Sequence, residues 1–437
     1  MTKKLATLGV FDKLFIGLLL VIFGGIVLHA PLTIWVGTFL PDADILIKSW
    51  KEILMGVATI VGTFIIWRKK RWDIVKNPLV LLIAGYALLH IALLPLFDQN
   101  PTSAVAGLLI DLRYLLFFVL VFAAICLYPT MRRVFIAVFV AGALVVGIFA
   151  LLQVFILPPD ILSLIGYGDA TISPYLTVDD NPDYVRINST LRGPNPLGAY
   201  AVIMLALAGA YVLRGRIAKN AKRPVVVVGI ILLTGLVALW ASYSRSALIA
   251  AFAALAVVLL LTVGRKISRW MWVMIIVIIF AVGGALFAAR NTSFVSNVIL
   301  HENEGTGATI SSNDGHAESL IDGLDRMVRQ PLGGGVGSTG SASLYGNEPL
   351  IIENQYLFIA HEVGWFGLAI FLAIFVKVLL LLWRRRSDWL ALGLLASGIG
   401  LALIGMLLPV WVDDTVSIVW WGLAAIVIAS SYRKSML

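Results

Sequence analysis

The chain has 437 residues, of which 60% are hydrophobic and 13% are charged, and its formal net charge is +9. Soluble domains carry about 25% charged residues, so this composition excludes an ordinary soluble domain and indicates a protein that lies in a lipid bilayer. The single cysteine, Cys126, excludes an intrachain disulfide. The positive charge does not indicate nucleic-acid binding, because the basic residues stand in short clusters between long apolar runs.

Long apolar runs follow one another along the chain and predict an all-α, polytopic integral membrane protein. Each run has about 17–25 residues, the length that crosses the hydrocarbon core of a bilayer. The first run follows Lys3, Lys4 and Lys13 and has no small-residue cleavage site, so we expect a retained helix and not a signal peptide. We predict about twelve spans, at residues 14–30, 45–67, 78–97, 111–128, 134–156, 197–213, 225–240, 246–263, 271–289, 354–382, 390–408 and 415–431.

The charged residues of the connections alternate in sign and predict how the chain is oriented. One set of connections holds most of the 33 lysine and arginine residues and only three acids, Asp12, Asp73 and Asp388. The positive-inside rule places this set and both termini in the cytoplasm, with the chain in a bacterial-type cytoplasmic (inner) membrane. The opposite set is acidic and includes two long outer loops, residues 157–196 and 290–353. We interpret residues 1–437 as a single transmembrane domain.

The cytoplasmic connections are too short for a nucleotide-binding domain, and the sequence has neither a P-loop nor a GxGxxG motif after a predicted strand. We therefore expect any chemistry on the outer face, where ATP and nucleotide sugars are absent. An enzyme in that position needs a donor that is already activated on a lipid. The sequence has no convincing internal repeat or inverted-half symmetry, which disfavours a secondary transporter.

The first candidate site lies where the first long outer loop meets the sixth span. Arg186 and Arg192 precede a helix that can begin near Pro196. This combination suits a phosphate, because guanidinium groups and the unpaired N–H groups of a helix start both bind phosphate oxygens. Arginine is depleted in outer loops, so we favour this interpretation over simple pairing with the acids of the loop. Those acids are Asp179, Asp180 and Asp183.

The second candidate site is a tight outer turn between two spans, at residues 240–247. Its only charged residue is Arg245. A lone arginine at the outer boundary of the membrane is costly unless it is paired or binds an anion. The alternative is that Arg245 extends towards the lipid headgroups.

The second long outer loop contains a predicted amphipathic helix at residues 314–329, which Pro331 ends. One face carries His316, Leu320, Gly323 and Met327, and the other carries Glu318, Asp322, Asp325 and Arg329. Arg326 and Arg329 each follow an acid by four residues, so ordinary helix ion pairs explain them. For His316 a structural role and a catalytic role remain equally open.

A glycine-rich segment, residues 331–341, then leads to Glu353 at the start of the tenth span. The segment either brings backbone N–H groups to a phosphate or forms a flexible turn. A carboxylate that enters a span from outside is costly, which makes Glu353 a functional candidate. The alternative is that Glu353 only caps the helix. On that helix we expect Glu353 and Gly364 to share a face and Glu362 to point to the opposite one.

The sequence gives little support for a metal site or a cofactor. The acidic pairs Asp179/Asp180 and Asp413/Asp414 are expected to be hydrated loop acids. Few charged residues lie deep in the spans, because Arg113, Lys48 and Lys51 are expected near the outer ends.

These segments together resemble the O-antigen ligase/polymerase superfamily of bacterial membrane glycosyltransferases. The matching segments are 186–200, 242–247, 315–319, 331–337 and 353–368, in the order of the family and among about twelve spans. The resemblance implies an undecaprenyl-pyrophosphate-linked glycan as donor, a glycan or glycolipid as acceptor, and metal-independent, inverting transfer without a cofactor. It also implies that outer arginines hold the pyrophosphate, which favours Arg186, Arg192 and Arg245.

The chain departs from the family at two positions. Ligases commonly have a histidine where this chain has Glu353, and many members have an arginine where it has His316. We therefore expect a repeat-unit polysaccharide polymerase, with Glu353 as the general base and His316 or His361 as the alternative base. The other possibilities within this class are an O-antigen ligase to lipid A core and a protein O-oligosaccharyltransferase. The rival classes are a lipid-linked glycan flippase and a structural membrane protein.

Overall fold

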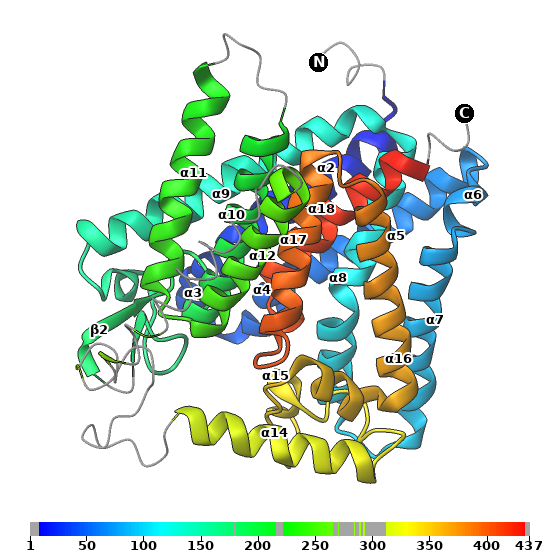
Figure 1. Ribbon diagram of the computed structural model, residues 1–437. Coiled ribbons are helices and arrows are strands. Elements are labelled where there is room, and N and C mark those ends of the chain that lie inside the picture. The colour runs from blue at the N-terminus through cyan, green and yellow to red at the C-terminus, as the bar shows by residue number, and fades with distance from the viewer. Residues whose placement is uncertain are drawn as a thin grey trace. The chain divides into compact units, whose positions relative to one another are not determined.

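The computed structural model describes residues 8–178, 181–215, 222–264 and 312–432, and the single positions 270, 284, 288, 289 and 292. In this part of the chain helices dominate and the strands form one hairpin, which confirms the predicted all-α class (Figure 1). Ten of the described helices are long and apolar enough to cross a membrane, so the chain is a polytopic integral membrane protein. The total of about twelve stays a prediction, because the predicted span 271–289 lies almost entirely outside the described residues.

The candidate spans follow the predicted ones in order. They are Val10–Phe39, Trp50–Arg68, Pro78–Leu96, Pro101–Leu127, Pro129–Phe155, Pro194–Arg214, Pro224–Ala241, Arg245–Val263, Gln355–Arg384 and Asp414–Tyr432. The predicted start of the fourth span, at residue 111, is wrong, because that helix begins at Pro101 and Arg113 lies well inside it. A shorter apolar helix, α17 (Trp389–Ile404), occupies the predicted span 390–408.

Asparagine followed by proline starts two of the spans. The side chain of Asn77 accepts the N–H of Leu79 at 2.9 Å at the start of α7 (Pro78–Leu93). Asn100 accepts the N–H of Thr102 at 2.8 Å at the start of α8 (Pro101–Leu127). An asparagine oxygen satisfies one exposed N–H group of the first turn, and proline lacks an N–H that would need a partner there.

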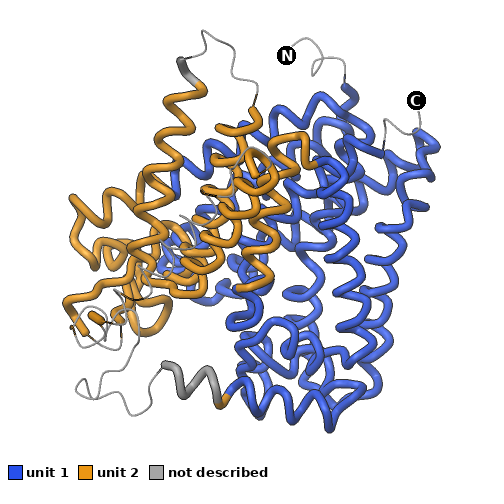
Figure 2. Tube along the Cα trace, in the orientation of Figure 1, with its two compact units in different colours: residues 1–146, 319–385, 404–437 blue, residues 147–318, 386–403 orange. Residues whose placement is uncertain are grey.

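The chain divides into two compact units, which are coloured separately in Figure 2. Unit 1 comprises Met1–Val146, Ser319–Arg385 and Ile404–Leu437. Its longer helices are α2 (Val10–Gly25), α3 (His29–Phe39), α5 (Trp50–Arg68), α7, α8, most of α9 (Arg132–Phe155), most of α14 (Ser312–Arg329), α16 (Gln355–Arg384) and α18 (Asp414–Tyr432). Its short helices are η1 (Ile26–Leu28), η2 (Pro41–Ala43), α4 (Asp44–Lys48), α6 (Trp72–Val75), η3 (Leu94–Leu96), η4 (Pro129–Met131), α15 (Gly340–Ser343) and η8 (Val410–Val412).

The core of unit 1 lies between α8 and α18, which are the most buried of its spans. Aromatic rings fill it: the rings of Trp420 and Trp421 are 5.1 Å apart, and those of Tyr114 and Trp421 are 5.5 Å apart. Large aromatic side chains remove much apolar surface at once and pack preferentially in tilted or edge-on pairs. The core therefore fixes α18 against α8 and, with it, the residues at the start of α18.

Unit 2 comprises Gly147–Glu318 and Arg386–Leu403. Its elements are the end of α9, η5 (Ile161–Ile165), β1 (Tyr175–Val178), β2 (Asn181–Ile187), α10 (Pro194–Arg214), α11 (Lys222–Ala241), α12 (Arg245–Val263) and most of α17. Helix α10 is the centre of this unit and packs on both α11 and α12. The antiparallel hairpin β1–β2 pairs Leu176 with Arg186, which places Arg186 near the end of the second strand.

Candidate functional site

Arg186 joins three segments of unit 2 that lie apart in the sequence. Its Nε donates a hydrogen bond to the carbonyl oxygen of Ser242 at 3.0 Å, and its Nη2 donates to Oδ1 of Asn195 at 2.7 Å. Asn195 lies in the first turn of α10, and Ser242 lies in the turn between α11 and α12. The half-buried guanidinium is therefore held in one orientation beside two helix starts.

The turn between α11 and α12 has only three residues, which confirms the predicted tight connection. Tyr243 takes a φ of 46°, the left-handed region that closes such a turn, and the N–H of Ser244 donates to Oγ of Ser242 at 3.2 Å. Burial and the neighbouring Tyr184 raise the pKa of the Tyr243 phenol, so Tyr243 keeps its hydroxyl proton. Arg245 is then the first residue of α12.

Gly198 allows the starts of α10 and α12 to lie side by side. A Cβ atom at this position would stand 2.7 Å from Cβ of Ala247 and 2.9 Å from Oγ of Ser242. Real Cβ atoms do not approach so closely, so any side chain at Gly198 would push the two helices apart. The close contact of α10 with the turn is thus encoded by a residue without a side chain.

Neither helix start is capped by the side chain of the residue before it. Gly193 precedes α10 and has no side chain, and the side chain of Ser244 forms no capping hydrogen bond with α12. Unsatisfied N–H groups and the helix dipole make such a start attractive to anions, and arginine adds a full charge. The structure brings Arg186 to this place and puts Arg245 on the first turn of α12. Arg192 precedes α10 and is exposed.

Glu353 belongs to unit 1 and lies just before α16, half-buried. Its backbone N–H donates to Oγ of Ser319 on α14 at 3.2 Å. The cap of α16 is the neighbouring Asn354, whose Oδ1 accepts the N–H groups of Tyr356 and Leu357. The alternative role for Glu353, a side-chain cap of this helix, is therefore wrong, since Asn354 performs it.

The predicted amphipathic helix is present as α14, which runs across the start of α16 (Figure 1). Arg326 and Arg329 form the expected ion pairs with Asp322 and Asp325, each at 2.8 Å. The indole N–H of Trp365 donates to the carbonyl oxygen of Met327 at 2.6 Å and ties α14 to α16. His316 lies on α14, but its side chain is outside the described part, so its role stays a prediction.

The sequence predicted that α16 is one regular helix with continuous faces. This prediction is wrong at one point, because the helix is interrupted at Val363 and Gly364. The interruption frees backbone groups that the glycine-rich segment then satisfies. Gly334 N–H donates to the carbonyl oxygen of His361 at 2.5 Å, and Trp365 N–H donates to that of Pro331 at 3.0 Å. Gly364 has a φ of 69°, which only glycine adopts without strain. The segment therefore packs against the interrupted helix and is not a free turn.

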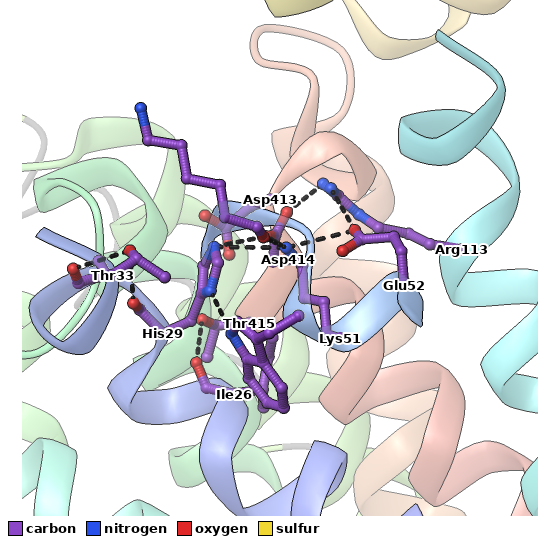
Figure 3. A network of polar contacts seen from close by, with 12 residues as sticks. Ile26, His29, Thr33, Lys51, Glu52, Arg113, Asp413, Asp414 and Thr415 are labelled. Atoms are coloured by element: carbon purple, nitrogen blue, oxygen red, sulfur yellow. Dashed lines mark hydrogen bonds and ion pairs between the residues drawn. The ribbon is translucent and has the colours of Figure 1, made fainter. Parts of the chain in front are cut away.

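A buried ionic cluster in unit 1 was missed by the sequence reasoning (Figure 3). Asp414, at the start of α18, pairs with Lys51 at 2.8 Å and with Arg113, and it lies 3.2 Å from Nε2 of His29. The expectation that Asp413 and Asp414 are hydrated loop acids is wrong, since both are buried. An acidic pair at the start of an apolar span was the available signal, because a buried carboxylate there requires cationic partners. Within the described residues, no three His, Cys, Asp or Glu side chains are arranged to hold a metal ion.

The fold and these sites define a class of protein: a multi-span α-helical membrane protein in which arginines are placed beside uncapped helix starts. In a comparison with protein families, residues 230–372 match the family described as O-Antigen ligase. The match supports the predicted similarity to the O-antigen ligase/polymerase superfamily, whose members are glycosyltransferase-like enzymes of polysaccharide biosynthesis. A comparison with curated proteins found no match. The matched range contains Arg245, His316 and Glu353, whereas Arg186 and Arg192 precede it.

Proposed function

We propose that the protein is a repeat-unit polysaccharide polymerase. It transfers a glycan from an undecaprenyl-pyrophosphate donor to a sugar hydroxyl of an acceptor glycan on the outer face of a bacterial cytoplasmic membrane. The match to the O-Antigen ligase family supports this general activity, with a lipid-linked glycan and a glycan or glycolipid as substrates. The observation that carries the proposal is Arg186, held between the uncapped starts of α10 and α12.

In this proposal Arg186, Arg192 and Arg245 bind the pyrophosphate of the donor. Arginine stays charged when it is partly buried, and its planar fork binds two phosphate oxygens at once. The N–H groups at the starts of α10 and α12 add donors to the same anion. The charge that develops on the departing pyrophosphate is thus met by groups that are already in place, and such preorganised groups supply much of the rate enhancement of many enzymes.

The transfer itself needs one further group, and we assign it to Glu353. The Glu353 carboxylate takes the proton of the acceptor hydroxyl while the hydroxyl oxygen attacks C1 of the donor sugar. The bond between C1 and the pyrophosphate oxygen breaks, and undecaprenyl pyrophosphate leaves with the electron pair. The new glycosidic bond has inverted configuration. No metal ion or cofactor takes part in this scheme, and His316 or His361 is the alternative base.

Polymerase is preferred to ligase because of the residue at the presumed base position. Related ligases commonly place histidine where this chain has Glu353. Transfer to lipid A core and transfer to protein are therefore the competing outcomes within the class. They are distinguished by the acceptor that a purified enzyme uses: its own product glycan, lipid A core or a protein hydroxyl.

The experiment that tests the anion site is Arg245→Lys in the full-length protein in proteoliposomes. Lysine keeps the charge but lacks the planar fork, so we expect transfer from an undecaprenyl-pyrophosphate-linked oligosaccharide to fall by about 10²-fold or more, the range for a lost transition-state donor. The matched control is Arg329→Lys, because Arg329 is exposed and its described ion pair, with Asp325, lies within α14. Wild-type transfer by Arg245→Lys would remove Arg245 from the site.

A further inference from the structure

The carboxylate of Glu362 is buried at the interruption of α16, with 1% of its surface exposed. Both of its oxygens accept backbone N–H groups of the glycine-rich segment. Oε2 accepts from Gly337 at 2.5 Å, and Oε1 accepts from Thr339 at 3.2 Å. A carboxylate that accepts two backbone N–H bonds is a strong and directional anchor for a loop.

Thr339 also forms hydrogen bonds with the residues just before α16. Its hydroxyl donates to the carbonyl oxygen of Leu350 at 3.0 Å and accepts the N–H of Ile352 at 3.2 Å. Ile352 is the neighbour of Glu353 in the chain and is itself buried. A continuous set of hydrogen bonds therefore runs from Glu362 through Thr339 to the residue beside Glu353.

Asp111 of α8 completes the anchor. It is buried and lies within hydrogen-bonding reach of the Glu362 carboxyl group. A hydrogen bond between two carboxyl groups needs one proton, which the pair shares. The fully buried His90 lies next to Asp111, and its Nε2 is 3.6 Å from Oδ2 of Asp111.

We propose that Glu362 is a positioning residue for glycan transfer: with Asp111 behind it, it holds Thr339, and through the Thr339 hydroxyl it fixes the segment that carries Glu353. The inference rests on the proposed function, because it takes Glu353 as the base. It assigns a task to a buried carboxylate that touches neither donor nor acceptor. Because the N–H groups of Gly337 and Thr339 donate to Glu362, they are not available to bind phosphate.

The first test measures backbone hydrogen exchange in the full-length protein, with Glu362→Gln, Thr339→Val and Thr339→Ser compared with wild type. Glutamine presents N–H groups where an oxygen must accept, so Glu362→Gln should speed exchange in both 336–340 and 350–354. Thr339→Val keeps the bonds to Glu362 and should speed exchange in 350–354 alone. Thr339→Ser restores the hydroxyl and should restore wild-type exchange. Asp111→Asn keeps a side chain that can hydrogen-bond the Glu362 carboxyl group, so exchange should stay slow.

The second test measures transfer kinetics with the lipid-linked oligosaccharide that wild type uses. Misplacement of a base by about 1 Å costs roughly 10²-fold, so kcat should fall by about 10- to 100-fold in Glu362→Gln and in Thr339→Val. KM for the donor should change little, and Thr339→Ser should recover the rate. Because both changes break one chain of contacts, the double variant should lose no more than the worse single variant.

Two results would overturn the inference. One is unchanged exchange at 350–354 in Glu362→Gln, since the constraint would then end at Thr339. The other is a wild-type kcat in a folded Glu362→Gln protein whose exchange at 350–354 is faster. Failure of the proposed function looks different: Glu353→Gln would then transfer at the wild-type rate while the exchange results still hold.

Discussion

At the scale of single residues, the chain assigns similar side chains to different tasks according to their surroundings. Glu353 and Glu362 lie nine positions apart. The buried Glu362 accepts two backbone N–H groups of the protein itself. Glu353 is half-buried, and the neighbouring Asn354 caps the helix. Burial and hydrogen-bond partners, and not residue type, thus decide which carboxylate is suited to receive a proton from substrate.

Replacement of Glu353 by glutamine is the decisive change for the proposed base. Glutamine keeps the shape and hydrogen-bonding capacity of the side chain but cannot take a proton. We expect binding of undecaprenyl pyrophosphate to survive and transfer to fall by roughly 10²- to 10⁴-fold, the range for a lost general base. Glu353→His should recover part of the rate, because imidazole is an effective base near neutral pH.

Reconstituted enzyme in defined lipid gives the measurement, with donor binding and transfer recorded on the same preparation. Wild-type transfer by Glu353→Gln would direct the search to His316 or His361. The control is Glu348→Gln, because Glu348 is an exposed acid of the loop that precedes α16.

At the scale of helices, the charged cluster at the start of α18 decides how α3, α5, α8 and α18 meet in unit 1. Lys51 and Arg113 bring two positive charges to Asp414, and Glu52 lies 3.2 Å from Lys51 (Figure 3). The indole N–H of Trp50 donates to Nδ1 of His29 at 2.9 Å, which leaves Nε2 to carry the imidazole proton toward Asp414. The partners come from several different helices, so the cluster specifies their register.

We expect Asp414→Asn to destabilise the protein strongly. Asparagine keeps the shape but leaves two buried cations with Glu52 as their remaining described counter-charge, and breaking a buried pair in this way costs about 3–5 kcal/mol. The matched control is Asp44→Asn, which removes an exposed pair with Lys48 in α4. That change should cost at most about 0.5 kcal/mol. Thermal unfolding of the purified proteins in one detergent provides the comparison, and equal shifts for both variants would contradict a structural role for the cluster.

At the scale of the whole molecule, the distribution of charge predicts that both termini are cytoplasmic and that the loop before α16 is outside. Glu348 and Ser387 are both exposed in the structure. We expect cysteines that replace them to report on opposite sides of the membrane. In intact cells an impermeant thiol reagent should label Glu348→Cys and leave Ser387→Cys unlabelled. The native Cys126 is buried and gives the background. The reverse pattern of labelling would overturn the orientation.

The sequence by itself determined the features that depend on neighbours within one or two helical turns. Apolar length predicted the spans, and the spacing of four residues predicted the ion pairs of Arg326 and Arg329. The three-residue turn before Arg245 was visible for the same reason. These features follow from helix geometry, which fixes contacts at short separations along the chain.

Only the tertiary structure decided which distant groups meet. Asp414 finds Lys51 and Arg113, Arg186 finds Ser242, and Glu362 finds the loop at Gly337, and none of these pairs has a local signature in the sequence. The physical reason is the cost of burying an unpaired charge, which forces each such group to take partners from whichever helices pack beside it. Hydropathy therefore predicts that a charge in a span needs a partner, and packing alone decides which partner that is.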